Sequence, residues 1–113
     1  MEIKKVLNQI VKRLKQADPY KIVLFGSHAK GVATPDSDID LMVILDNNNI
    51  AKTYDERMGN KLNMRRLVRD INYKYPMDIL VYSKAELNKV KNHGNSFVEE
   101  IEKTGKVIYE KGS

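Results

Sequence analysis

The sequence contains no cysteine and no long apolar run. Without cysteine, disulfide bonds, zinc–thiolate sites and thiol catalysis are all excluded. No apolar stretch approaches the roughly 18 residues that a membrane helix requires, and charged residues interrupt the N-terminal segment where a secretory signal would be apolar. We therefore expect a cytoplasmic protein with no membrane partner.

The chain is short and basic. Its 113 residues suit one domain, which we expect to span 1–113. The net charge of +5 favours phosphate-bearing ligands, nucleic acid or an acidic protein partner. The alternative is an ordinary lysine-rich solvated surface, because the lysines are spread along the chain rather than clustered.

Helical and strand-like segments alternate along the chain. Apolar residues recur at intervals of three or four over 2–16, which predicts an amphipathic helix. Short β-branched runs predict buried strands. In chain order, we expect a strand at 21–25, a helical turn or two at 28–32 and a second strand at 38–45. A long helix at 51–73 and a third strand at 77–82 follow. The last elements are a helix after Ser83, a helix over 96–103 and an edge strand at 106–109. This order predicts an α/β (α+β) domain with a small mixed sheet flanked by helices.

The long helix expected at 51–73 has two faces. One face is basic, and it is either a solvated surface or a surface that binds a nucleotide or an acidic partner. No aromatic residues alternate with these basic residues, so nucleic acid is not the expected partner. The residues expected to point inward are Tyr54, Met58, Leu62, Leu67, Val68 and Ile71, and the basic face holds Arg57, Lys61, Arg65, Arg66 and Arg69.

Gly26 and Ser27 lie where the first expected strand turns into a helix. Glycine lets the backbone approach a phosphate closely, and a helix start offers unpaired N–H groups to an anion. The Ser27 hydroxyl adds a donor. A Gly-Ser pair also occurs at many ordinary turns, so this signal needs support from other residues.

Asp38 and Asp40 begin the second strand at positions i and i+2, so their carboxylates point to the same side. Two like charges on one face repel each other, and a divalent cation would relieve the conflict. Mg²⁺ prefers such hard oxygen ligands together with substrate phosphates. The alternative is that both aspartates are solvated at a strand end.

Asp78 begins the third strand, as Asp38 and Asp40 begin the second. A carboxylate there could share the metal and accept a proton from an attacking hydroxyl, or it could simply cap a turn. Gly26 and the aspartates meet only if strands one and two are antiparallel and strands two and three are parallel. The helix at 51–73 supplies the crossover that a parallel pair needs.

Gly26 and Ser27, ten intervening residues, and then Asp38-Ile39-Asp40 form a Gly-Ser-x10-Asp-x-Asp pattern. This pattern resembles the polymerase-beta-like nucleotidyltransferases. The wider segment from Leu24 to Leu41 is similar to their short MNT-type members, and the resemblance extends to the strand around Asp78 and to the C-terminal segment.

The resemblance implies the nucleotidyltransferase fold and two Mg²⁺ ions, held by Asp38, Asp40 and Asp78. It implies that ATP is the substrate, and that its phosphates contact Gly26 and Ser27. Two further residues of the same segment, Lys30 and Ser37, are assigned to nucleotide binding. Short members of this family often pair with a HEPN-type toxin and transfer AMP to it, so a hetero-oligomer with such a toxin is implied.

Three hypotheses stay open at this point. The chain is an enzyme that transfers AMP from ATP to a hydroxyl of a partner protein, or a non-catalytic antitoxin that neutralises its partner by binding and occlusion. A third hypothesis is nucleotidyl transfer to a small molecule. Relatives with that activity usually have a second domain for the acceptor, and this chain is short for one.

Overall fold

The computed structural model describes residues 3–112. Met1, Glu2 and Ser113 lie outside the described part, and with them the first residue of the expected helix at 2–16 and both ends of the expected domain. No helix within the described range is long and apolar enough to span a membrane. The elements are α1 (Ile3–Leu14), η1 (Lys15–Ala17), β1 (Pro19–Phe25), α2 (Gly26–Lys30), β2 (Ile39–Leu45), α3 (Tyr54–Leu67), α4 (Arg69–Lys74), β3 (Met77–Ser83), α5 (Lys84–Asn92), α6 (Ser96–Thr104) and β4 (Lys106–Glu110).

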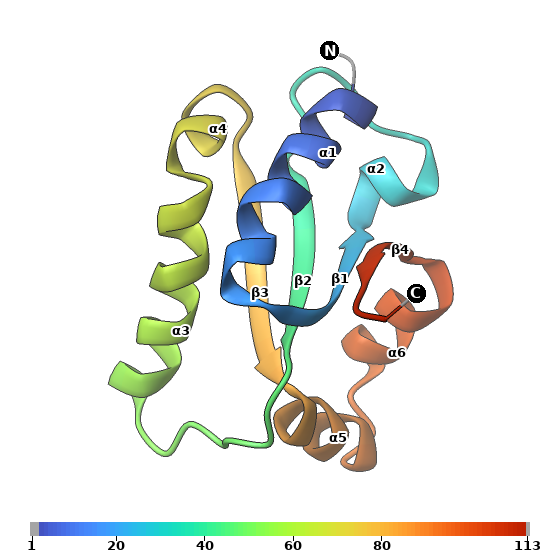
Figure 1. Cartoon of the computed structure of the whole chain (residues 1–113). Helices are drawn as coiled ribbons and strands as arrows, with labels where there is room; N and C mark the ends of the chain where they lie inside the picture. Colours follow the sequence, from blue (N-terminus) through green and yellow to red (C-terminus); the bar gives the residue numbers. More distant parts are fainter. Residues whose placement is uncertain (1–2, 113) are drawn as a thin grey trace.

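The four strands form one mixed sheet in the order β3-β2-β1-β4 (Figure 1). β1 is antiparallel to β2 and to β4, whereas β2 and β3 are parallel. Helix α3 lies in the connection between the two parallel strands, as such a connection requires. The expected α/β architecture and the relative directions of the three central strands are confirmed.

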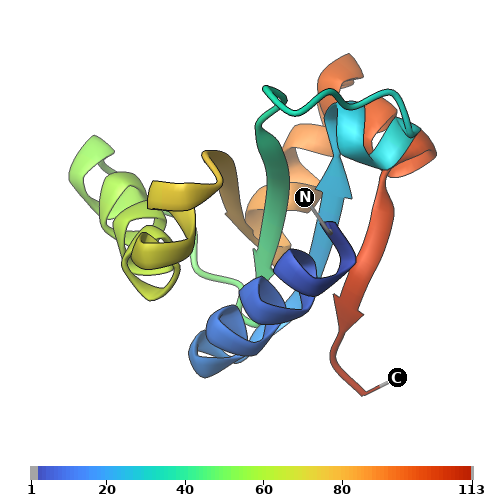
Figure 2. The same cartoon turned by 90° about the horizontal axis from the view of Figure 1, so that it is seen from above.

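Helices cover both faces of the sheet (Figure 2). Helix α1 and the end of α3 pack on one face, where Ile10, Leu41 and Met64 belong to one buried cluster. Helices α5 and α6 pack on the other face, against Met42 and Ile44 of β2. Because side chains alternate along a strand, Asp40 lies on the same face as Met42, which is the face of α5 and α6.

The helix expected at 51–73 is in fact two helices. α3 begins at Tyr54, after Thr53 caps it by accepting a hydrogen bond from the Glu56 amide (3.1 Å), and the chain leaves helical geometry at Val68 (φ −116°). The expected inward face is wrong in its first half, where Tyr54 is 74% and Leu62 48% exposed. Only the second half of α3 contacts the core, so the burial pattern starts at Met64.

Smaller differences concern element ends. β1 begins at Pro19 rather than at residue 21, because Asp18 turns the chain with a left-handed backbone (φ +50°). β2 begins at Ile39, which leaves Asp38 just before it, and the short helix expected at 28–32 occupies Gly26–Lys30 instead. The break at 92–95 and the last strand are confirmed.

Ser83 caps α5, the helix expected to follow it. Its side chain accepts a hydrogen bond from the Glu86 amide (3.1 Å), and Glu86 Oε1 accepts one from the Ser83 amide (2.8 Å). This reciprocal pair satisfies two helix-end donors. It also fixes the direction in which the chain leaves β3 and starts the layer over the carboxylate face.

Candidate functional site

Three aspartates lie at one end of the sheet. Asp40 of β2 pairs in register with Phe25, the last residue of β1, and with Asp78 of β3 on its other side. Adjacent strands lie roughly 4.8 Å apart. The register therefore brings the end of β1, Asp40 and Asp78 side by side, with Asp38 one residue before β2.

Gly26 lies directly against the Asp40 carboxylate. Its backbone has a left-handed conformation (φ +74°), and a Cβ on this residue would overlap Asp40 Oδ2. Only glycine combines this backbone angle with this close approach. Gly26 thus lies against Asp40, which pairs with Asp78 on the neighbouring strand. That these residues act together as one site stays a prediction.

The carboxylates influence one another electrostatically. Partial burial raises the pKa of Asp40, and the negative charges of Asp78 and Asp38 raise that pKa further, while His28 opposes the shift. A carboxylate that two like charges surround is stabilised by an added cation. The site therefore favours a positively charged ligand.

Lys61 of α3 also reaches this site. Its ammonium lies 3.9 Å from Asp78 Oδ1, and its side chain is only 33% exposed. The sequence pattern assigned Lys61 to an outward basic face and missed this contact. The helical spacing could have revealed this contact. Lys61 lies three residues before the buried Met64 and shares its side of the helix, so it faces β3.

The loop between α2 and β2 is held by polar contacts. His28 Nε2 lies 3.3 Å from the Ser37 carbonyl oxygen and donates to it when that nitrogen carries the proton. The Ser37 hydroxyl accepts a hydrogen bond from the Thr34 amide (2.9 Å). The Ser27 hydroxyl makes no hydrogen bond within residues 3–112. Ser37 thus shapes the loop, while Ser27 keeps its donor available beside Gly26.

Lys30 does not point at the carboxylates. Its ammonium pairs with Glu100 of α6 at 3.1 Å, on an exposed surface. The expected contact of Lys30 with a nucleotide stays a prediction, and it requires this ion pair to open. An exposed pair of this kind contributes roughly 0–1 kcal/mol, so opening it costs little.

The residues at this end fit a hard divalent cation. Carboxylate oxygens are the ligands that Mg²⁺ prefers, and the glycine at position 26 leaves space beside Asp40 that a side chain would fill. Within the described range 3–112, no group of three or more His, Cys, Asp or Glu side chains is placed to hold a metal ion as the side chains stand. The chemistry of the nearby carboxylates, whose like charges raise the pKa of Asp40, fits the ion.

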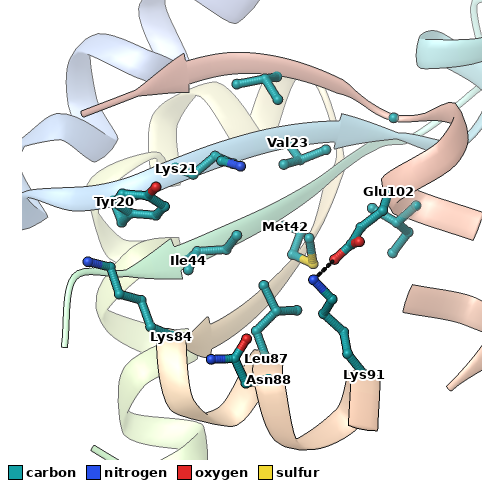
Figure 3. A pocket seen from close by; sticks show the side chains of 13 residues that line it. Tyr20, Lys21, Val23, Met42, Ile44, Lys84, Leu87, Asn88, Lys91 and Glu102 are labelled. Carbon is teal, nitrogen blue, oxygen red and sulfur yellow. Dashed lines mark ion pairs between the residues drawn. The ribbon is translucent and has the colours of Figure 1, made fainter. Parts of the chain in front are cut away.

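A separate cavity of about 540 Å³ lies on the same face of the sheet, between α5, α6 and the strands (Figure 3). Buried Val23, Met42 and Ile44 form its floor. The ion pair of Lys91 and Glu102 (3.0 Å) joins the two helices at its edge. None of the three aspartates lines this cavity, so the carboxylate site does not depend on it.

Comparisons with known proteins agree with this geometry. The model of the family described as "Polymerase beta, Nucleotidyltransferase" matches residues 8–113. A Methanocaldococcus jannaschii protein, named provisionally as a protein adenylyltransferase, is 53% identical over 51 residues. That segment is 42% of this chain and spans about half (49%) of the relative's length.

Two solved structures share the fold. A Sulfolobus solfataricus protein, described provisionally as a nucleotidyltransferase, superposes with a TM-score of 0.61 at 15% identity, over 96% of this chain and 83% of that one. A toxin–antitoxin structure with AMP-PNP superposes with a TM-score of 0.57 at 19% identity, over 94% and 74%. At these identities the likeness concerns the fold alone.

Proposed function

We propose that this chain, which belongs to the polymerase beta nucleotidyltransferase family, transfers AMP from ATP to a hydroxyl of a partner protein in a Mg²⁺-dependent reaction. The main support is the register that aligns Phe25, Asp40 and Asp78 across three strands and sets Gly26 against the Asp40 carboxylate. A fold likeness alone would not specify chemistry. The arrangement of carboxylates beside a glycine turn is the observation that supports the proposed chemistry.

Asp38, Asp40 and Asp78 would hold two Mg²⁺ ions. When bound, such ions neutralise phosphate charge and stabilise the entering and leaving oxygens. The chain's own groups position the reactants. An acceptor hydroxyl forms a bond to the α-phosphorus of ATP, the bond from that phosphorus to the bridging oxygen breaks, and pyrophosphate leaves. Asp78 takes the hydroxyl proton.

Gly26 and Ser27 would receive the triphosphate. Without a side chain, Gly26 lets the main chain approach a phosphate, and the Ser27 hydroxyl has no competing partner within residues 3–112. Lys30 exchanges Glu100 for a phosphate oxygen when the nucleotide arrives, and Ser37 holds the shape of the loop between α2 and β2 through its contact with Thr34. Binding then depends on a few donors and on the metal.

The acceptor is assigned to a HEPN-type toxin, for which this chain would be the cytoplasmic antitoxin. Two similarities support this assignment: the relative is named for adenylylation of proteins, and one fold neighbour is a toxin–antitoxin structure. A stable hetero-oligomer with the toxin would bring the acceptor hydroxyl to the carboxylates.

One experiment tests this function. The chain is co-expressed with the protein encoded beside it in the genome, and the partner's intact mass is measured after incubation with ATP and Mg²⁺. We expect an increase equal to one or more AMP groups, which is absent with Asp38→Ala/Asp40→Ala. If the double variant still protects cells and no adduct forms, AMP transfer is refuted and inhibition by occlusion replaces it.

Occlusion without catalysis is the second candidate function. The observation that favours it is the ion pair of Lys30 with Glu100, because it holds the Lys30 ammonium on α6 instead of at the proposed triphosphate site. Transfer to a small molecule is the third, and it predicts AMP transfer in the absence of any protein partner. The mass measurement separates the first from the other two, and release of pyrophosphate from ATP in the absence of the partner, with a small-molecule acceptor, identifies the third.

A further inference from the structure

Helix α3 has a stripe of apolar and basic residues that the proposed chemistry does not use, in which Met58 and Lys61 are half-buried and the other four are exposed. Residues three and four apart share one side of a helix. Two parallel rows arise in this way, one of Tyr54, Met58 and Leu62 and the other of Arg57, Lys61 and Arg65. We call these six residues the α3 stripe.

The stripe is continuous with the carboxylate site. Helix α3 runs beside β3 in the opposite direction (Figure 1). Lys61, in the middle of the stripe, lies 3.9 Å from Asp78 Oδ1. Arg57, nearer the start of α3, lines a hollow of about 390 Å³ together with Tyr82 at the far end of β3. The stripe thus extends along β3 from the hollow to the catalytic end of the sheet.

The hollow is also basic. Lys89 and His93 of α5 and the loop after it form its opposite wall. Its one acidic residue, Glu86, is engaged with the amides of Ala51 (3.0 Å) and Ser83 (2.8 Å). The lining of the hollow therefore carries Arg57 and Lys89, and its carboxylate is already bound to main-chain amides.

Two of the three basic side chains of the stripe are not used inside the domain, whereas Lys61 pairs with Asp78. Among residues 3–112, Arg57 and Arg65 have no ion pair or side-chain hydrogen bond. Arginine and tyrosine are the residues most enriched at energetically important interface positions. Cations without internal partners next to an exposed apolar row are complementary to an acidic polypeptide.

We propose that the α3 stripe and the adjoining hollow bind an acidic segment of the protein acceptor and direct its hydroxyl to the carboxylates. This inference rests on the proposed protein-adenylylation function. From Arg57 to Arg65 the helix rises about 12 Å, and four strand residues from Tyr82 to Asp78 cover about 13 Å. An extended segment of about four residues therefore connects the hollow with the catalytic end.

The test uses two matched double variants on neighbouring helical surface. Arg57→Glu/Arg65→Glu reverses two charges of the stripe. Arg66→Glu/Arg69→Glu makes the same change in net charge outside the stripe and the hollow. Circular dichroism and thermal melts establish that both variants are folded.

The probe is a random copolymer of glutamate and tyrosine, which is acidic and has hydroxyls; a lysine–tyrosine copolymer is the basic counterpart. AMP incorporation is followed with ATP labelled at the α-phosphate, and binding by fluorescence anisotropy. We expect the stripe variant to raise KM for the acidic copolymer about tenfold with kcat nearly unchanged, because two exposed charge contacts are reversed. The control variant should stay within about twofold of the unmodified chain.

The outcomes separate the two proposals. Equal transfer by both double variants refutes the docking surface and leaves AMP transfer intact. A second result is that the chain transfers no AMP and still binds the acidic copolymer, with binding weakened in the stripe variant and not in the control variant. That result supports the docking surface and refutes protein adenylylation. Equal binding by both variants, or tighter stripe-dependent binding of a single-stranded RNA oligonucleotide than of the copolymer, overturns the docking proposal.

Discussion

Replacing Gly26 by alanine tests the contact between the glycine turn and the Asp40 carboxylate. The new Cβ would overlap Asp40 Oδ2, and the residue has a φ of +74°. Gly31 is a matched control because its φ is +76° but a Cβ there meets nothing within 4 Å. The left-handed backbone costs roughly 1–2 kcal/mol for a residue with a Cβ. Both variants should therefore lose about that much stability, or roughly 4 °C in Tm per kcal/mol.

The two variants should differ in ligand binding. A ligand at 100 times its Kd stabilises a folded protein by about 2.7 kcal/mol, which raises Tm by roughly 10 °C here. Thermal melts with and without Mg²⁺ and a non-hydrolysable ATP analogue should show this rise for the unmodified chain and for Gly31→Ala. Gly26→Ala should show none, because Asp40 must turn away from the new methyl group. An equal ligand-induced rise in both variants would refute the assignment of Gly26 to the nucleotide site.

Three further predictions concern single side chains. Asp40→Asn removes a half-buried charge beside Asp78, so the metal-free protein should melt at the same or a higher temperature. AMP transfer should fall by at least about 100-fold. A lower Tm with retained transfer would contradict both expectations. Lys111 and Lys84 lower the pKa of Asp46 to about 2, below the unfolded value of about 3.9. These contacts therefore stabilise the fold above about pH 4, and the stabilisation is lost as the pH falls toward 2. The Tm difference between the unmodified chain and Asp46→Asn should shrink over that range, and a constant difference would refute the linkage. Ser83→Ala should lower the free energy of unfolding, measured by urea denaturation, by about 1–2 kcal/mol, because the buried hydroxyl caps α5 and donates to the Asn49 carbonyl. Thr53→Ala removes an exposed cap for comparison, and an equal or smaller loss in Ser83→Ala would contradict this.

Local patterns predicted most of the sheet. β-branched runs located β2 and β3, and the aspartates at their starts required a parallel pair that the register confirms. Gly26 at the end of one strand and Asp38 at the start of the next could face one ligand only if β1 and β2 were antiparallel, which is the case. These relations were readable because a strand has a fixed side-chain period and a parallel pair needs a long crossover.

The sequence could not show which side of α3 faces the core or which groups the lysines contact. Tyr54, Met58 and Leu62 satisfy a helical period as well as the truly buried Met64 does, and only the position of α3 against β3 decides between them. Lys61 and Lys30 look alike in the sequence, yet one lies beside Asp78 and the other pairs with Glu100. Such pairings depend on tertiary contacts far apart along the chain.

Metal binding tests the central claim most directly, namely that Asp38, Asp40 and Asp78 form one nucleotide–metal site. Mn²⁺ replaces Mg²⁺, and electron paramagnetic resonance measures the bound ion in the presence of an ATP analogue that cannot release pyrophosphate. We predict nucleotide-dependent Mn²⁺ binding that each of Asp38→Asn, Asp40→Asn and Asp78→Asn weakens at least about tenfold, with Asp36→Asn in the nearby loop as a control that binds normally. Undiminished binding in the three variants, or no binding by the unmodified chain, would contradict the account.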